Sequence, residues 1–102
     1  MVIAKDYQQV PASTTAQLKG QQGVGTLGDI LETILITPLT TSPGEVTVQD
    51  GSGAIVEIFA GGAGSVSDLK PFYATFGAKS VTGPWELTTG ANVKVTVFGR
   101  FN

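Results

Sequence analysis

The residues able to do acid–base chemistry in this sequence are carboxylates, and four stand in its central part: Glu45, Asp50, Glu57 and Asp68. Two carboxylates at a fixed separation can cleave a glycosidic bond. Glu45 and Glu57 flank a predicted hairpin turn, which places them on opposite arms and within reach of each other. Both positions also fit solvated strand faces, and a chain of 102 residues has little room for a sugar cleft. We therefore predict no catalytic residues.

Other kinds of catalysis and metal binding are limited by the residue types that the chain lacks. It contains no Cys and no His, which removes thiolate ligands, the usual imidazole base and the Ser–His–Asp triad. Asp50, Gly51 and Ser52 offer oxygen ligands for calcium, but the other acids of a calcium loop are missing, and a plain turn is favoured. We expect a protein that is not an enzyme, binds no metal and acts on no small-molecule substrate.

Two glycine-rich segments are candidates for phosphate or cofactor binding. Residues 23–28 match the G-x-G-x-x-G dinucleotide pattern, but that motif opens a helix inside a parallel unit, and here β-branched residues follow. Residues 61–65 lack the Lys of a phosphate-binding loop. Both segments are therefore expected to be loops, the second a flexible one, and no cofactor is expected.

Charge and hydropathy narrow the choice of partners. The formal net charge is −2 and the six cations are scattered along the chain, whereas nonspecific nucleic-acid binding needs clustered Lys and Arg. The longest apolar stretch, residues 30–39, is far shorter than the roughly 20 residues of a spanning helix. No secretion signal is recognisable at the N-terminus. The expected partners include neither nucleic acid nor membrane, and synthesis in a cytoplasm is expected.

The elements that must position these residues are strands, because apolar side chains recur with a period of two. Val93, Val95 and Val97 alternate with polar residues, and residues 45–49 and 54–59 form a hairpin around an Asp-Gly turn. A helix competes over residues 30–39, but β-branched residues and Pro38 favour a strand. The expected strands cover residues 5–10, 16–19, 30–39, 45–49, 54–59, 71–76, 84–88 and 93–101, with a turn at residues 77–80.

Eight short antiparallel strands in about 100 residues predict an all-β, single-domain β-sandwich, jelly-roll-like by first choice and immunoglobulin-like by second. Residues 1–25 are expected as an N-terminal arm with edge strands, and residues 26–102 as the core of the sandwich. Strand order cannot be read from the sequence. The predicted core is Ile30, Ile34, Ile36, Val46, Val48, Val56, Ile58, Phe72, Trp85, Leu87, Val93, Val95 and Val97.

Three large aromatic residues have two interpretations. Trp85, Tyr73 and Phe72 are able to form a platform for a carbohydrate, since sugars stack on aromatic rings. Aromatic residues in a small β-domain are more often core, and the alternation of Trp85 and Leu87 with Glu86 fits that. The core interpretation is favoured.

Two stretches resemble a known group of proteins. Residues 36–53 form one, and residues 58–63 and 67–72, continuing into Thr88-Thr89-Gly90-Ala91-Asn92-Val93, form the other. They resemble small virion proteins of tailed bacteriophages that act as head decoration or cement proteins. The likeness covers roughly residues 26–101, and residues 88–93 are its most recognisable part.

The resemblance implies a structural virion protein on the outer surface of the capsid, a homotrimer that stabilises the shell by binding between major capsid protein subunits. The low charged fraction of 14% fits such contacts, because few ions would need pairing on burial. Residues 1–10 are expected as an arm that exchanges between subunits or grips the capsid. A carbohydrate-binding module, or a component of a head fibre, tail fibre or neck, remains the alternative. The expected partner-contact residues are Val2, Ile3, Tyr7, Gly61, Gly62, Ser65 and Asp68.

Overall fold

The computed structural model of the chain describes residues 6–20 and 25–102, in which all regular structure is β. The expected strands are confirmed, with ends that shift by up to three residues. They are β1 (Asp6–Val10), β2 (Thr15–Gln17), β3 (Ile30–Pro38), β4 (Val46–Asp50), β5 (Ile55–Phe59), β6 (Phe72–Lys79), β7 (Trp85–Thr89) and β8 (Val93–Arg100).

The strands pair as a single long hairpin that has been rolled up. β1 pairs with β8, β2 with β7, β3 with β6 and β4 with β5, all antiparallel. Two further pairings, β3 with β8 and β4 with β7, close the roll. Sheet A therefore has the order β1-β8-β3-β6 and sheet B the order β2-β7-β4-β5. This is a jelly roll, as predicted from the sequence, and not an immunoglobulin-like sandwich.

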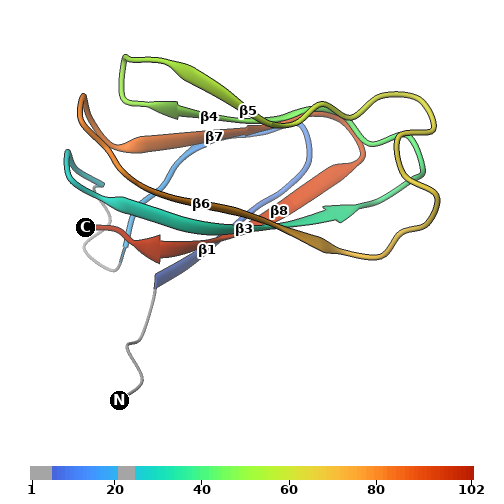
Figure 1. The fold of residues 1–102 in the computed structure, drawn as a ribbon, viewed down its shortest axis with the longest axis horizontal. Helices are drawn as coiled ribbons and strands as arrows, with labels where there is room; N and C mark the ends of the chain where they lie inside the picture. The colour runs from blue at the N-terminus through green and yellow to red at the C-terminus, as the bar shows by residue number, and fades with distance from the viewer. Residues whose placement is uncertain (1–5, 21–24) are drawn as a thin grey trace.

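The two sheets form two layers around one core (Figure 1). The core comes from the inward residues of both sheets, with β8 alternating almost strictly between buried and exposed positions. The completely or almost completely buried apolar residues are Val10, Leu18, Leu31, Ile34, Ile36, Val46, Val48, Trp85, Leu87, Val93, Val95, Val97 and Phe101.

Four predicted core residues are not fully buried. Val56 is 39% exposed because β5 is an edge strand of sheet B, so nothing flanks it on one side. Ile58 and Phe72 are half-buried and pack against the core from its margin. Ile30 is half-buried and alternates with the inward Leu31, so it lies on the outer side of sheet A.

The turn predicted at residues 77–80 is wrong in its first part, because β6 continues through Gly77 to Lys79. The register of β3 and β6 shifts by one residue at this point, from Leu31 opposite Ala78 to Thr33 opposite Thr75. Gly77 has a φ of 74°, the left-handed conformation that glycine adopts without strain. It therefore supplies a β-bulge inside a strand, which is the other common role of a glycine with positive φ.

A buried carboxylate holds one end of the sandwich together. Asp29 is 1% exposed, and its Oδ2 accepts a hydrogen bond from the Thr26 N–H at 2.9 Å. Its Oδ1 accepts from the Asn102 N–H, the Asn102 side-chain amide and the Thr26 hydroxyl, at 3.1, 2.7 and 3.2 Å. The indole Nε1–H of Trp85 donates to the Asp29 carbonyl oxygen at 3.0 Å. These bonds join the segment before β3 to the residues after β8.

The N-terminal residues that the structure describes belong to the sandwich. β1 is an edge strand of sheet A and β2 an edge strand of sheet B, and Val10 and Leu18 are fully buried between the sheets. Residues 1–5 and 21–24 lie outside the described residues, and with them the predicted contact residues Val2 and Ile3.

Candidate functional site

The carboxylates Glu45 and Glu57 come together beside β4 and β5, as the hairpin predicted. A hydrogen bond to Glu57, with smaller contributions from desolvation and from the negative charge of Glu57, raises the pKa of Glu45 above its usual value. Both side chains are exposed. The described residues contain no group of three or more His, Cys, Asp or Glu side chains able to hold a metal ion. What the structure gives here is a pair of surface carboxyls that interact with each other.

Asp50, the other acid of this hairpin, caps a neighbouring connection. Its carboxylate accepts the Val81 N–H at 2.9 Å and the Thr82 N–H at 3.1 Å. Desolvation opposes ionisation of this carboxyl and by itself would raise the pKa of Asp50. The pKa is nevertheless lowered, because the ionised form accepts hydrogen bonds from the backbone of Val81, Thr82 and Gly83 and from the Thr82 hydroxyl. Asp50 therefore ties the β6–β7 connection to the β4–β5 turn.

The segment after β5, predicted as a flexible loop and as a contact surface, is bonded to the β3–β4 connection. The Gly62 N–H donates to the Pro43 carbonyl at 2.8 Å, and the Gly64 N–H donates to the Ser42 hydroxyl at 3.0 Å. A Cβ on Gly61 would lie 2.5 Å from the Gly44 carbonyl oxygen, so a close approach of two backbones requires that glycine.

The other predicted contact residues of this segment face outward. Gly62, Ser65 and Asp68 are exposed, and the Asp68 carboxylate accepts the Lys70 N–H at 3.0 Å. The structure does not bring them near Tyr7, which lies on β1 of sheet A.

The aromatic platform considered for carbohydrate binding is not formed by these three residues. Trp85 is 3% exposed and packs edge-to-face on Phe76, with ring centroids 5.3 Å apart. Phe72 faces inward and packs in the same way on Phe59. Only Tyr73 is open to solvent, 67% exposed. The core interpretation is confirmed for Trp85.

A set of outward apolar side chains lies on the outer face of sheet A. Residues that alternate with buried ones along a strand point away from the core. Cross-strand register aligns them in two rows that run over all four strands. One row is Tyr7, Phe98, Thr33 and Thr75, and the other is Gln9, Thr96, Leu35 and Tyr73.

Four of these eight side chains are large and apolar or aromatic. Tyr7 and Tyr73, on the two edge strands, are each 67% exposed. Leu35 and Phe98, on the central strands β3 and β8, are half-buried although no element of the described residues covers that side of the sheet in Figure 1. We call this set, Tyr7, Leu35, Tyr73 and Phe98, the apolar strip.

Cations lie on both sides of the apolar strip, toward the two ends of the strands of sheet A. Arg100 and Lys79 are both aligned with Ile30 and flank it at one end of the face. Lys94 is aligned with Thr37 at the other end. All three cations are exposed.

The sheet's carboxylate on this side is Glu32, at the bulge where β3 shifts register against β8. It is half-buried, and its Oε2 atom is inaccessible to solvent. Among the described residues, the outer face of sheet A therefore carries three exposed cations and one half-buried carboxylate.

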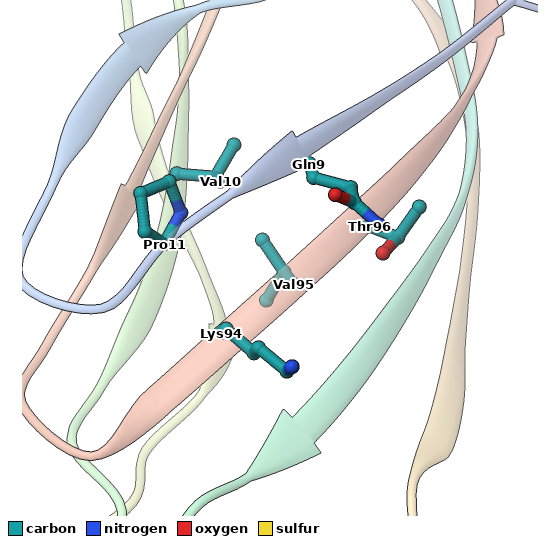
Figure 2. A pocket seen from close by; sticks show the side chains of 6 residues that line it. All are labelled: Gln9, Val10, Pro11, Lys94, Val95 and Thr96. Carbon is teal, nitrogen blue, oxygen red and sulfur yellow. The ribbon is translucent and has the colours of Figure 1, made fainter.

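A hollow of about 290 Å³ opens beside Lys94, where β1 ends against β8 (Figure 2). Figure 2 shows Gln9 and Thr96 beside each other and Lys94 farther along β8. The lining thus includes an amide, a hydroxyl and an ammonium, and all three are hydrogen-bond donors. The lining residues are Gln9, Val10, Pro11, Lys94, Val95 and Thr96.

The outer face of sheet B has the opposite character. Register aligns Gln17, Glu86, Gln49 and Ile55 in one row, and Thr15, Thr88, Thr47 and Glu57 in the next. These eight residues include two carboxylates, no cation and one large apolar side chain, Ile55, on the edge strand. The two outer faces of the sandwich therefore differ in both hydropathy and sign of charge.

The sequence analysis predicted Tyr7 as a contact residue and considered Tyr73 for a carbohydrate platform, but it did not single out Leu35 and Phe98. The signal was present: Leu35 and Phe98 are apolar residues out of phase with the inward positions of their strands. Without the strand order, nothing placed these two residues on adjacent strands of the same sheet.

The comparisons with known proteins add no relative to this picture. The chain matches no model of a known protein family. A search of curated proteins finds no significant match. Among the described residues, no helix is long and apolar enough to cross a membrane.

Proposed function

We propose that this chain is a non-enzymatic structural protein of a tailed-bacteriophage virion, which decorates the outer surface of the capsid and stabilises it. The partner in this proposal is the major capsid protein, and the protein acts as a homotrimer where capsid subunits meet. The observation that carries the proposal is the exposed apolar strip on sheet A, with Tyr7 and Tyr73 each 67% exposed. Exposed apolar patches on a small protein mark surfaces for association.

The architecture supports such a role energetically. Leu35 and Phe98 project from the two central strands of sheet A, whose backbone is hydrogen-bonded on both sides. A contact surface built on paired strands is ordered before binding, so association costs less conformational entropy than it would for a mobile loop. The threonines interspersed with the strip, Thr33, Thr75 and Thr96, add polar contacts without the desolvation cost of ions.

Stabilisation of a shell follows from preferential binding to its mature form. A ligand that binds one state of a lattice and not the others shifts the equilibrium toward that state by its differential affinity. A trimer engages several capsid subunits at once, which raises the effective concentration of each contact.

The test is binding to purified heads of the phage that encodes the chain. Light scattering on a size-exclusion column is expected to give the mass of a trimer, and the protein is expected to sediment with expanded heads at a fixed stoichiometry. Heads carrying the protein are expected to release their contents at a higher temperature than bare heads. A monomer that leaves heads unbound would refute the proposal.

A second candidate is glycan binding, and one observation favours it. Tyr7 and Tyr73 offer exposed aromatic rings on the same face as the hollow lined by Gln9, Thr96 and Lys94. Aromatic rings with amide and hydroxyl groups nearby are suited to sugars. Binding on a glycan array that is lost in Tyr73→Ala, with an unchanged unfolding temperature, would support this candidate over the first.

A further inference from the structure

We infer that the outer face of sheet A binds an extended, acidic segment of another protein, whose carboxylates lie near Lys94 at one end and Arg100 at the other. This inference deepens the proposed function, because it names the surface that contacts the capsid and the chemistry of the partner. It rests on the spacing of charges along β8, on the apolar strip and on the hollow beside Lys94.

The outward residues of β8 define what such a segment must carry. Lys94, Thr96, Phe98 and Arg100 lie on one face at every second position of an eight-residue strand. A strand rises about 3.3 Å per residue, so Lys94 and Arg100 are about 20 Å apart. An extended segment aligned with β8 meets both cations when its own carboxylates are six residues apart. Its residues at the two intermediate positions of the same face then contact Thr96 and Phe98.

The hollow gives one end of the segment a defined site. The Lys94 ammonium, the Gln9 amide and the Thr96 hydroxyl surround it, and a carboxylate accepts hydrogen bonds from all three kinds of donor. Pro11, which is exposed, adds apolar surface beside these donors for the methylene groups of a Glu or Asp side chain.

A second copy of this chain fits the face poorly. Placing two sheet A faces together brings the cations Lys79, Lys94 and Arg100 of one copy against those of the other, and like charges repel. Stacking sheet A on the acidic face of sheet B pairs the signs correctly. That face, however, offers the apolar strip only Ile55 among its outward residues. The strip would be buried against hydrated Thr and Gln side chains, at a desolvation cost.

The experiment uses the whole chain, labelled with ¹⁵N, and two synthetic peptides of nine residues. The first is Ser-Glu-Ser-Leu-Ser-Leu-Ser-Glu-Ser, with carboxylates six residues apart and leucines between them on one face. The second replaces both Glu by Lys. We expect the first peptide to cause small shifts of the amide signals of β8 and its neighbours in sheet A, and these shifts to become smaller at high salt. The second peptide is expected to leave the signals unchanged. Equal shifts with both peptides, or shifts confined to sheet B, would overturn the inference.

Charge-removing variants test the two ends of the site. Lys94→Gln and Arg100→Gln are each expected to weaken peptide binding by about 1.5- to 5-fold, the usual worth of an exposed ion pair. Lys70→Gln is the matched control, because Lys70 is an exposed cation outside the strands of sheet A. It is expected to bind as the wild type does. If Lys70→Gln weakens binding as much as the other two, the effect is one of net charge and the inference fails.

Two further outcomes separate this inference from its alternatives. Shifts of the sheet A signals with maltohexaose and not with the acidic peptide would assign the face to glycans. A concentration-dependent dimer that disappears in Arg100→Gln would assign it to a second copy. Head binding is measured separately. If the wild type and the double variant Lys94→Gln/Arg100→Gln bind heads equally well, the outer face of sheet A is not the contact surface, and the proposed function is unaffected. Peptide binding without head binding would refute the proposed function alone.

Discussion

Replacement of Asp29 by Asn is expected to be among the most destabilising isosteric changes in the chain. The Asp29 carboxylate is 1% exposed and accepts four hydrogen bonds, from Thr26 and Asn102. An amide of the same shape keeps one acceptor oxygen and turns the other into a donor. If the oxygen stays toward Asn102, the new NH₂ group faces the Thr26 N–H, and neither donor is satisfied.

The magnitude follows from the bonds that are lost. A buried donor left without a partner costs about 1–3 kcal/mol, and a hydrogen bond to a charged group is worth about 1.5–3 kcal/mol. Because Thr26 is itself exposed and its bond to Asp29 only partly buried, the lower half of each range applies, and one broken charged bond and one opposed donor give a loss of about 2.5–4 kcal/mol in the free energy of unfolding. A domain of this size has about 5–15 kcal/mol in total, so the variant should fold but be clearly weakened. Its melting temperature should fall by about 10–30 °C, at about 4–8 °C per kcal/mol.

Urea unfolding followed by the fluorescence of Trp85, the chain's single Trp, measures this loss. With a slope of about 1–3 kcal/mol per molar urea, the midpoint should fall by about 1–4 M. Asp68→Asn is the matched control: Asp68 is exposed and accepts one backbone hydrogen bond, so its change should stay within about 0.5 kcal/mol. An Asp29→Asn midpoint as close to the wild type as that of the control would refute the view that this carboxylate holds the end of the sandwich together.

Three other predictions follow from the same structure. The pKa of Asp50 is lower in the folded protein than its unfolded value of 3.8, so the ionised carboxylate stabilises the fold above pH 3.8, and this effect is lost as the pH falls through the folded pKa. The difference in free energy of unfolding between the wild type and Asp50→Asn should therefore be constant near neutral pH and disappear below about pH 4. The raised pKa of Glu45 has the opposite consequence: its stabilising effect is present below the unfolded value of 4.5 and is lost as the pH rises through the folded value. Glu57→Gln should lower the pKa of Glu45, measured by NMR titration, and an unchanged titration would show that the two carboxyls do not interact. Leu87→Ala, at a fully buried position, should cost about 2–5 kcal/mol in urea unfolding, whereas Val56→Ala, at the open edge, should cost under about 1 kcal/mol; equal costs would mean that β5 is as enclosed as β7.

The strands and the core were predictable because both depend on local pattern. The alternation of Val93, Val95 and Val97 with polar residues predicts which face of the strand points inward, and all three valines are fully or almost fully buried. The Asp-Gly turn likewise determined the pairing of β4 with β5, and with it the contact between Glu45 and Glu57. Short-range signals of this kind survive folding because neighbours in sequence stay neighbours in a hairpin.

The errors arose where burial depends on strand order. Val56 has the residue type and phase of a core position, and only the place of β5 at the edge of sheet B leaves it 39% exposed. Leu18 and Phe101 are buried although they lie just outside the observed strands; the expected strands 16–19 and 93–101 contain both residues, but neither was placed in the predicted core. The carboxylate of Asp29 is buried by partners 3 and 73 residues away, and the sequence gives no signal for the distant one.

The apolar strip is informative because the fold does not need it. Leu35 and Phe98 point away from a core already filled by the inward residues of β3 and β8, so threonine at either position would preserve the pleat and its hydrogen bonds. Exposed apolar side chains such as Leu35 and Phe98 give a protein a tendency to associate through the face that carries them. The cations at both ends of that face oppose association between identical copies by like-charge repulsion. The same cations attract a partner that carries carboxylates, and at low salt they accelerate its association. A face that is apolar in its centre, positive at its ends and unnecessary for folding is therefore selective in which surface it accepts, whereas the polar face of sheet B has neither property.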